Sequence, residues 1–213
     1  MNRNPLDITA ALFDLDGVII DTEPQYTEFW AGIGREFQLP DANFANVVKG
    51  QTLTYIFETY FPDANQQQFL RERLYEFERQ MSYPYIAGAI EFVEQLYRLQ
   101  IPTAVVTSSN QEKMAQVYAA HPELKQLFTA IMTSEDTPRS KPAPDCYIIA
   151  AERLGRPIES CVVFEDSLNG LRAGRDSGAR VVGLTTSNPK EMIAPLSDVV
   201  IPNFCGFSLE QAF

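Results

Sequence analysis

Short apolar runs alternate with segments of helical periodicity along most of the chain. The runs have the length and continuity of strands buried on both faces, and they cover residues 11–13, 103–106, 130–132, 161–164 and 180–184. The helical segments between them include residues 114–120, 145–154 and 168–176. This alternation predicts an α/β fold: a doubly wound, Rossmann-like parallel sheet with helices on both faces.

The segment 22–83 has a different pattern, because aromatic and charged residues recur there at helical spacing without a convincing strand. Pro40 and Pro62, each followed by an aspartate, predict breaks between helices. We therefore predict that residues 22–83 form a small, all-α helical insertion. It is expected to divide an α/β core made of residues 1–21 and 84–213.

Several other side chains are expected to have structural roles. After the insertion, Ile90, Val93 and Tyr97 lie on one face of a predicted helix. The lone histidine, His121, precedes a proline and is expected at a helix end. The cysteines lack the Cys-x-x-Cys spacing of a zinc site and are odd in number, so we expect buried free thiols at Cys146, Cys161 and Cys205.

The length and net charge of the chain limit the kinds of molecule that it is expected to bind. The chain has 213 residues, enough for a sizeable core, and its net charge of −11 would repel duplex nucleic acid and anionic membrane surfaces. No stretch approaches the ~20 apolar residues of a membrane span, and the first residues do not resemble a signal peptide. We expect a cytoplasmic protein without a nucleic-acid, membrane or obligate protein partner.

Polar side chains follow four of the predicted strands or their loops. The first strand leads to Asp14 and Asp16, the second to the run 107–110, the third, after a loop, to Lys141, and the fourth to the pair 165–166. In an open α/β sheet, the carboxyl ends of the strands share one edge, so these groups are expected to converge. The carboxylates favour Mg²⁺, and the lysine and hydroxyls favour an anion, which together indicate phosphate chemistry at a nucleophilic carboxylate.

Each piece also has an ordinary structural interpretation. Asp-x-Asp-Gly occurs in turns, and Ser109 or Asn110 would serve equally well as a helix N-cap. A lone lysine before a proline, such as Lys141, is usually exposed to solvent. The combination of all four pieces on one edge favours the phosphate site.

In this order and spacing, the four motifs resemble those of the haloacid dehalogenase superfamily of phosphohydrolases. The closer likeness is to the β-phosphoglucomutase-like and sugar-phosphatase branch, and the helical insertion matches the cap of that branch. The likeness covers essentially the whole chain. The motifs are Asp14–Val18, Thr107–Ser108, Lys141–Asp145 and Glu165–Ser167.

The resemblance implies that Asp14 is the nucleophile, which becomes an aspartyl-phosphate, and that Asp16 is the acid and then the base. It also implies that Mg²⁺ is held by the Asp14 side chain, the Asp16 backbone carbonyl and Asp166. Glu165 would be either a further direct ligand or an outer partner. Thr107 would hold the transferring phosphoryl group.

The resemblance further implies that the Ser108 N–H also holds phosphoryl oxygens and that Lys141 neutralises the charge shared by them and Asp14. Substrate choice is expected to lie with the cap, which would close over the core and exclude water. Ser109 and Asn110 are substrate-binding candidates on the core side. The cap candidates are Glu23, Tyr26, Trp30, Lys49, Gly50, Gln51 and Thr52.

Some of these cap candidates have alternative roles. Tyr26 and Trp30 are favoured as packing residues of the cap, because aromatic side chains at helical spacing are usually core. Lys49, before Gly50, either reaches toward a second anionic group of the substrate or is simply exposed.

The favoured function is Mg²⁺-dependent hydrolysis of a small phosphomonoester, preferably a sugar or polyol phosphate. The alternative is a phosphosugar mutase of the β-phosphoglucomutase type. In that mutase a histidine gates proton transfer where this chain has Tyr26, and no cap lysine is evident near 78–81, so hydrolysis is favoured.

The dehalogenase branch uses no magnesium and would leave the acidic pair 165–166 unexplained. A third hypothesis, a signalling receiver domain, is disfavoured by the insertion and by Asp16.

Overall fold

The computed structural model describes residues 8–41 and 43–212. Its centre is a six-stranded sheet in the order β3-β2-β1-β4-β5-β6, in which every neighbouring pair is parallel. The strands are β1 (Ala10–Phe13), β2 (Thr103–Val106), β3 (Ala130–Met132), β4 (Cys161–Glu165), β5 (Arg180–Leu184) and β6 (Val199–Ile201). This is the doubly wound α/β fold that the sequence predicts.

Helices cover both faces of the sheet, which explains why the strands are apolar throughout. In β1, Phe13 packs on one face with Phe92 and other aromatic rings, while Leu12 packs on the other with Tyr147. The helices of the sheet layer are α5 (Ala89–Arg98), α6 (Gln111–Ala120), α7 (Leu124–Leu127), α8 (Asp145–Arg153), α9 (Leu168–Ser177) and α10 (Lys190–Ile193). Because alternate side chains of β1 are buried on opposite sides, no position in the strand favours a polar residue.

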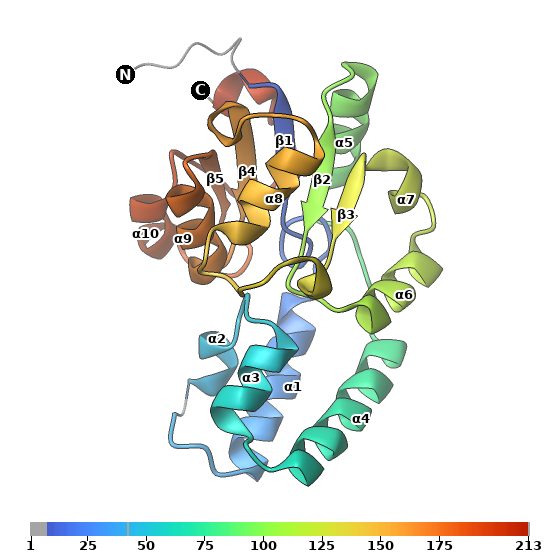
Figure 1. Cartoon of the computed structure of the whole chain (residues 1–213), viewed down its shortest axis with the longest axis vertical. Helices are drawn as coiled ribbons and strands as arrows, with labels where there is room; N and C mark the ends of the chain where they lie inside the picture. Colours follow the sequence, from blue (N-terminus) through green and yellow to red (C-terminus); the bar gives the residue numbers. More distant parts are fainter. Residues whose placement is uncertain (1–7, 42, 213) are drawn as a thin grey trace.

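The segment between β1 and α5 folds into helices with a core of their own. They lie beyond the carboxyl ends of the strands (Figure 1). Trp30 and Ile33 pack there with the buried aromatic side chains of Phe44, Phe57 and Phe61. The four inserted helices are α1 (Glu23–Glu36), α2 (Phe44–Val47), α3 (Leu53–Tyr60) and α4 (Ala64–Gln80). The prediction that Trp30 is a packing residue is confirmed.

Two of these helices begin at side-chain caps. The Thr52 hydroxyl accepts a hydrogen bond from the Tyr55 N–H at the start of α3, and Asp63 accepts from Asn65 and Gln66 at the start of α4. A cap of this kind supplies a partner for an N–H that lacks one within the helix. The predicted helix break at Pro62 is therefore confirmed.

One expectation from the sequence needs correction, and two elements were not predicted. On α5, Tyr97 is 62% exposed, and the buried face of the helix consists of Ala89, Phe92, Val93 and Leu96. Cys205 is exposed, although Cys146 and Cys161 are buried thiols as expected. Strand β6 and helix α10 were not predicted, because β6 is short, lies at the sheet edge and is only partly buried.

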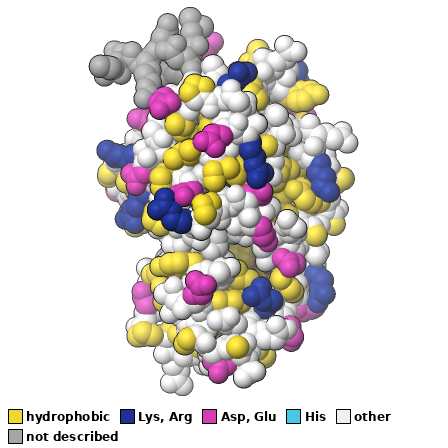
Figure 2. Space-filling model, in the orientation of Figure 1, with side chains coloured by type: hydrophobic (Ala, Val, Ile, Leu, Met, Phe, Trp, Pro, Cys, Tyr) yellow, Lys and Arg dark blue, Asp and Glu magenta, His cyan; other side chains and the backbone are white. Residues whose placement is uncertain are grey.

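The surface is indented where the inserted helices meet the sheet layer, as Figure 2 shows on one face of the molecule. No helix in the described part of the chain is long and apolar enough to cross a membrane. His121 ends α6, as expected, and its ring nitrogen Nε2 lies 2.6 Å from the Tyr83 carbonyl oxygen.

Candidate active site

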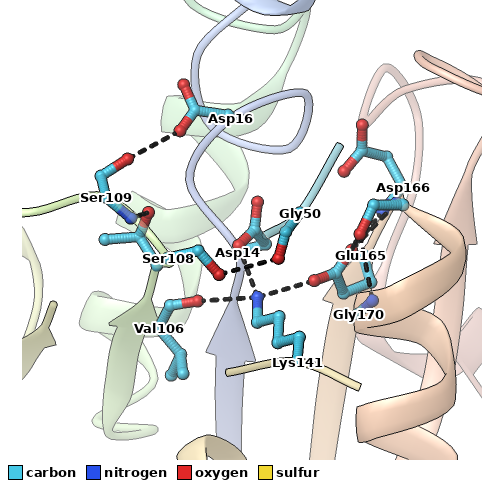
Figure 3. A network of polar contacts seen from close by, with 12 residues as sticks. Asp14, Asp16, Gly50, Val106, Ser108, Ser109, Lys141, Glu165, Asp166 and Gly170 are labelled. Carbon is cyan, nitrogen blue, oxygen red and sulfur yellow. Dashed lines mark hydrogen bonds and ion pairs between the residues drawn. The ribbon is translucent and has the colours of Figure 1, made fainter. Parts of the chain in front are cut away.

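Lys141 lies at the centre of the polar groups that converge on the carboxyl edge of the sheet (Figure 3). Its Nζ donates to Asp14 Oδ1 at 2.6 Å, to Glu165 Oε1 at 2.7 Å and to the Val106 carbonyl oxygen at 3.1 Å. Only 3% of the residue is exposed, so the solvent-exposed interpretation of this lysine is wrong. The ends of β1, β2 and β4 thus share one buried cation.

Both carboxylate oxygens of Glu165 are engaged by the protein. Oε1 also accepts from the Tyr147 hydroxyl at 2.9 Å, and Oε2 accepts from the backbone N–H groups of Asp166 and Ser167 and from the Ser167 hydroxyl. A Cβ on Gly170 would lie 1.6 Å from Oε1, so the first turn of α9 leaves room for this carboxylate only because it has a glycine there. The geometry indicates that Glu165 orients Lys141.

Asp166 lies beside the first aspartate motif. Its Oδ2 accepts from the Ser187 hydroxyl, and its backbone oxygen accepts from the Asn188 amide. A Cβ on Gly17, which has a φ of 75°, would lie 2.0 Å from the same Oδ2. Glycine at this position therefore allows both the left-handed turn and the close approach of Asp166.

One oxygen each from Asp14, Glu165 and Asp166 lies within 4.8 Å of the others. Burial, opposed mainly by Lys141, raises the pKa of Asp14 to about 8. Burial, followed by the charges of Glu165 and Glu23, raises the pKa of Asp166. Burial opposes the charge of Lys141, but the neighbouring carboxylates of Asp14 and Glu165 raise its pKa well above the usual value.

This charge distribution fits a divalent cation. Asp14 and Asp166 are acidic side chains in a site from which water is largely excluded. Lys141 forms ion pairs with Asp14 and Glu165. Oxygen ligands of this kind are those that Mg²⁺ prefers, and a bound cation would favour the ionised form of both aspartates. Asp14 and Asp166 therefore fit a magnesium site, whereas the oxygens of Glu165 already have protein partners.

Asp16 points away from Lys141, toward the second strand end and α6 (Figure 3). Its Oδ2 accepts from the Ser109 hydroxyl at 3.1 Å, and its Oδ1 accepts from the Thr22 hydroxyl and from Lys113 Nζ. Lys113 is only 4% exposed and lies in the first turn of α6. A buried ion pair thus holds the second carboxylate of the first motif in place.

The end of β2 supplies the remaining core-side candidates. The Thr107 hydroxyl accepts from the Ser109 N–H at 3.0 Å, and the Ser108 hydroxyl donates to the Gly50 carbonyl oxygen at 3.0 Å. Asn110 caps α6 by accepting from the Lys113 N–H, which confirms the N-cap interpretation for Asn110 but not for Ser109. All four residues from 107 to 110 line a cavity between the sheet edge and the inserted helices.

This cavity has a volume of about 100 Å³ and also contains Asp14, Asp16 and Asp166 in its wall. From the inserted segment it is lined by several of the predicted cap residues and by Glu78, which was not predicted. We call this set the insert side of the cavity: Glu23, Tyr26, Trp30, Lys49, Gly50, Gln51 and Glu78. The structure therefore brings all the predicted site residues except Thr52, Lys141 and Glu165 to one cavity wall. Lys141 and Glu165 lie directly behind Asp14.

Two pairs organise the insert side. Lys49 Nζ lies 3.5 Å from Glu23 Oε2, with both side chains largely buried, so Lys49 is not simply an exposed lysine. The Tyr26 hydroxyl donates to Glu78 Oε1 at 2.8 Å, and Lys113 Nζ lies 4.4 Å from the centre of the Tyr26 ring. Tyr26 thus packs against Phe77, as the packing interpretation expects, and also contacts the polar network around Asp16.

The loop between α2 and α3 contacts three different segments of the sheet layer. The Gly50 carbonyl accepts from Ser108, the Lys49 carbonyl accepts from the Asn169 amide at 3.1 Å, and the Thr52 hydroxyl lies 2.6 Å from that of Ser140. These contacts join the loop to the ends of β2 and β4 and to the segment that carries Lys141.

Sequence reasoning missed Lys113, Glu78 and Ser187. Lys113 follows the Asn110 cap by three positions, which places it in the first turn of the helix after a functional strand end. Ser187 belongs to a polar run after β5, the same signal that identified the other strand ends. Glu78 had no such signal, since its role depends on the packing of α4 against α1.

Comparisons with known proteins agree with this geometry. The model of the haloacid dehalogenase-like hydrolase family matches residues 8–178. Glycerol-1-phosphate phosphohydrolase 2 of Saccharomyces cerevisiae is 27% identical over 212 residues, covering 93% of this chain and 83% of the relative. A fructose-1-phosphate phosphatase of Escherichia coli is 29% identical over 184 residues, covering 80% of this chain and 93% of the relative.

Solved structures share the same fold. A family IA hydrolase from Entamoeba histolytica has a TM-score of 0.81 with 22% identity, covering 96% of this chain and 97% of that one. A β-phosphoglucomutase from Clostridium difficile has a TM-score of 0.77 with 18% identity, covering 95% and 94% of the two chains. The family match spans most of the chain and contains all four motifs, so this protein belongs to the haloacid dehalogenase-like family of hydrolases.

Proposed function

We propose that this hydrolase is a magnesium-dependent phosphatase that cleaves a small phosphomonoester, preferably a sugar or polyol phosphate, through an aspartyl-phosphate. The observation that carries the proposal is the contact of Lys141 with both Asp14 and Glu165, with Asp166 alongside, next to the cavity that contains Asp16. Two of its relatives are named as phosphatases of a polyol phosphate and a sugar phosphate.

In the first step, a carboxylate oxygen of Asp14 attacks phosphorus, the new O–P bond forms, and the ester O–P bond breaks. The leaving oxygen takes a proton from Asp16 and departs as an alcohol. In the second step, Asp16 takes a proton from water, whose oxygen displaces the Asp14 carboxylate and releases inorganic phosphate. Covalent catalysis of this kind divides one difficult displacement into two easier ones.

The chain's own donors stabilise the charge on the transferring phosphoryl group. Lys141 is preplaced against Asp14, and the Thr107 hydroxyl and the Ser108 N–H lie at the neighbouring strand end. Preplaced donors and cations supply a large share of transition-state stabilisation in phosphoryl transfer, because they need no reorganisation during the reaction. Glu165 acts through Lys141, which it holds in position.

Magnesium would be held by the Asp14 and Asp166 side chains and the Asp16 backbone carbonyl, and when bound it neutralises phosphoryl charge as a Lewis acid. Residues 22–83 act as a cap domain in this proposal, and 1–21 with 84–213 act as the core. The contacts of Gly50 and Thr52 with the sheet layer support a closed arrangement that shields the reaction from water.

Hydrolysis is favoured over phosphosugar mutase activity. The position of the mutase's gating histidine holds Tyr26, whose hydroxyl is committed to Glu78. The family match to hydrolases also argues against the receiver-domain hypothesis, in which the phosphorylated aspartate itself would be the output.

The test is phosphate release from a panel of sugar, polyol and nucleotide monophosphates, with Mg²⁺ and then with EDTA. The panel includes β-glucose 1-phosphate with its bisphosphate activator. We expect magnesium-dependent release from a few polyol or sugar esters. Conversion of the 1-phosphate to the 6-phosphate without phosphate release would identify a mutase instead, and the absence of any turnover would contradict both.

A further inference from the structure

We propose that the insert side of the cavity selects a neutral, hydroxyl-bearing leaving group and disfavours a substrate with a second anionic group. Glu23 and Gln51 are the acceptors that bind the substrate hydroxyls. The proposal deepens the proposed function and rests on it, since it concerns the part of the same substrate that carries no transferred phosphate. It depends on how the charges of the cavity wall are paired.

The cations of the cavity wall are already neutralised. Among the described residues that line the cavity, Lys49 and Lys113 carry positive charge. Lys49 is paired with Glu23, and Lys113 is paired with Asp16 while its ammonium group also faces the Tyr26 ring. A second phosphate or carboxylate of a substrate would therefore have to displace a protein carboxylate to gain a counter-ion.

The carboxyl groups of this region outnumber its lysines. Glu23, Glu78 and Asp16 face the cavity together with Lys49 and Lys113, so there are three carboxyl groups for two ammonium groups. Glu78 is only 4% exposed, and its hydrogen-bond partner is a neutral hydroxyl, that of Tyr26. In a site with restricted solvent, a like charge brought close to such a group is strongly disfavoured.

Two buried acceptors lack hydrogen-bond donors. Glu23 Oε2 and Gln51 Oε1 are both inaccessible to solvent and have no hydrogen-bond partner in the described part of the chain. Lys49 approaches Glu23 Oε2 only to ion-pair distance, 3.5 Å. A buried acceptor without a donor is costly, so a ligand that brings hydroxyl donors to this side gains the hydrogen bonds that are missing. Both residues line the cavity.

The matched probes are glycerol 3-phosphate and 3-phosphoglycerate, which differ in a terminal alcohol against a terminal carboxylate. Binding is measured by calorimetry on the Asp14→Asn variant with Mg²⁺, so that turnover does not consume the ligand. We expect the alcohol to bind at least about tenfold more tightly, a difference of ~1.4 kcal/mol. Equal binding, tighter binding of the acid, or binding of neither probe overturns the proposal.

The wild-type enzyme provides a second measurement that does not depend on that variant. The ratio of kcat/KM for the two probes is expected to favour the alcohol by a similar factor. Magnesium-dependent hydrolysis of p-nitrophenyl phosphate, which has no hydroxyls on its leaving group, tests the phosphatase chemistry separately. Turnover of that ester with no preference between the probes overturns only the present proposal, whereas no turnover of any ester overturns the proposed function.

Glu23→Gln tests the charge of the insert side directly. The amide keeps an acceptor oxygen but removes the negative charge and releases Lys49, so the preference for the alcohol is expected to fall about fivefold or more. The matched control is Glu36→Gln in the same helix, because Glu36 forms an exposed ion pair with Arg73 at 2.5 Å. An unchanged preference in Glu23→Gln, or an equal change in the control, contradicts the assignment.

Discussion

The two sides of the cavity are built in different ways. On the sheet side, Lys141, Glu165 and Asp14 are fixed by buried strand ends and by direct ion pairs. On the insert side, Glu23 and Lys49 come from separate segments of a helical layer that has its own aromatic core. The sheet side is formed by the ends of the strands themselves. The insert side faces the cavity only because the helical layer packs against the sheet layer.

In the function proposed here, this difference separates the groups that act on phosphorus from the groups that select the substrate. The groups proposed to act on phosphorus stand at positions that the parallel sheet defines, and all of them are in the core layer. The groups proposed to face the rest of the substrate come mainly from the insertion and are held in side-chain pairs such as Tyr26–Glu78. A change on the sheet side should therefore affect every substrate, while a change on the insert side should affect substrates unequally.

The largest expected effect is that of Asp14→Asn on the sheet side. Loss of the nucleophile is expected to lower kcat by about 10⁴-fold or more for every ester tested, as is typical when the attacking group is removed. Phosphate release measures the effect, and circular dichroism checks the fold. The control is Asp176→Asn, an exposed aspartate of α9, which should retain activity. Near wild-type turnover in Asp14→Asn would contradict the assignment of Asp14 as the nucleophile.

Removal of magnesium with EDTA is expected to abolish hydrolysis of all substrates, and added Mg²⁺ should restore it. Because binding to the native state stabilises it, saturating Mg²⁺ should also raise the melting temperature by several degrees. Differential scanning fluorimetry measures the shift, with Asp166→Asn as the comparison that should weaken it. Full activity in EDTA would contradict the metal site.

Lys113→Met tests the ion pair between Lys113 and Asp16, which lies where the sheet side meets the insert side. The ion pair with Asp16 is lost, so kcat for an alkyl phosphate should fall about 10- to 100-fold, part of the roughly 10²- to 10⁴-fold that general acid–base catalysis contributes. The fall should be smaller for p-nitrophenyl phosphate, whose leaving oxygen needs less protonation. Lys125→Met, which removes a lysine that lies over the Tyr118 ring, is the control. Equal losses for both esters would indicate a purely structural role for Lys113.

Gly50→Ala tests the docking of the α2–α3 loop. Gly50 has a φ of 72°, and an added Cβ would lie 2.5 Å from the Ser167 hydroxyl oxygen. We expect KM to rise by roughly tenfold, because the loop must shift away from the sheet layer; the left-handed strain itself costs ~1–2 kcal/mol. Gly155→Ala is a matched control, since Gly155 has a φ of 65° but has nothing within 4 Å of its added Cβ. If both variants change KM equally, docking is not the cause.

The smallest expected effect is on pH-dependent stability. Burial raises the pKa of Glu78, so the folded state binds more protons than the unfolded state above the usual pKa of the group, and stability falls as pH rises there. Glu78→Gln removes this dependence. The free energy of unfolding of the variant minus that of wild type should therefore be larger at pH 7 than at pH 4. Urea unfolding at the two pH values measures it. A greater relative gain at pH 4 would show that the sign is wrong.

Much of the sheet side was predictable from the sequence. Strands β2, β3 and β5 occupy the ranges that their apolar runs predict, because strands buried on both faces need continuous apolar residues. The polar residues after β1, β2 and β4 converge because parallel strands end at one edge. The edge strand β6 was missed, because it is short and only partly buried.

The insert side was less predictable, for a physical reason. Helical spacing places Tyr26 on one face of α1, but it does not show that Lys113 of a distant helix lies over its ring. Nor does it show that Glu78 receives the Tyr26 hydroxyl, since α1 and α4 are far apart in sequence. Contacts between side chains of separate layers depend on how the layers pack, which local patterns do not encode.

The loop that joins α2 and α3 touches the sheet layer largely through its main chain, with the carbonyl groups of Lys49 and Gly50 as acceptors. These two hydrogen bonds use main-chain oxygens, so they do not depend on which amino acid stands at position 49. In the function proposed here, replacement of the Lys49 side chain can change substrate preference while these two hydrogen bonds persist. Selectivity and the docking of this loop can then evolve separately.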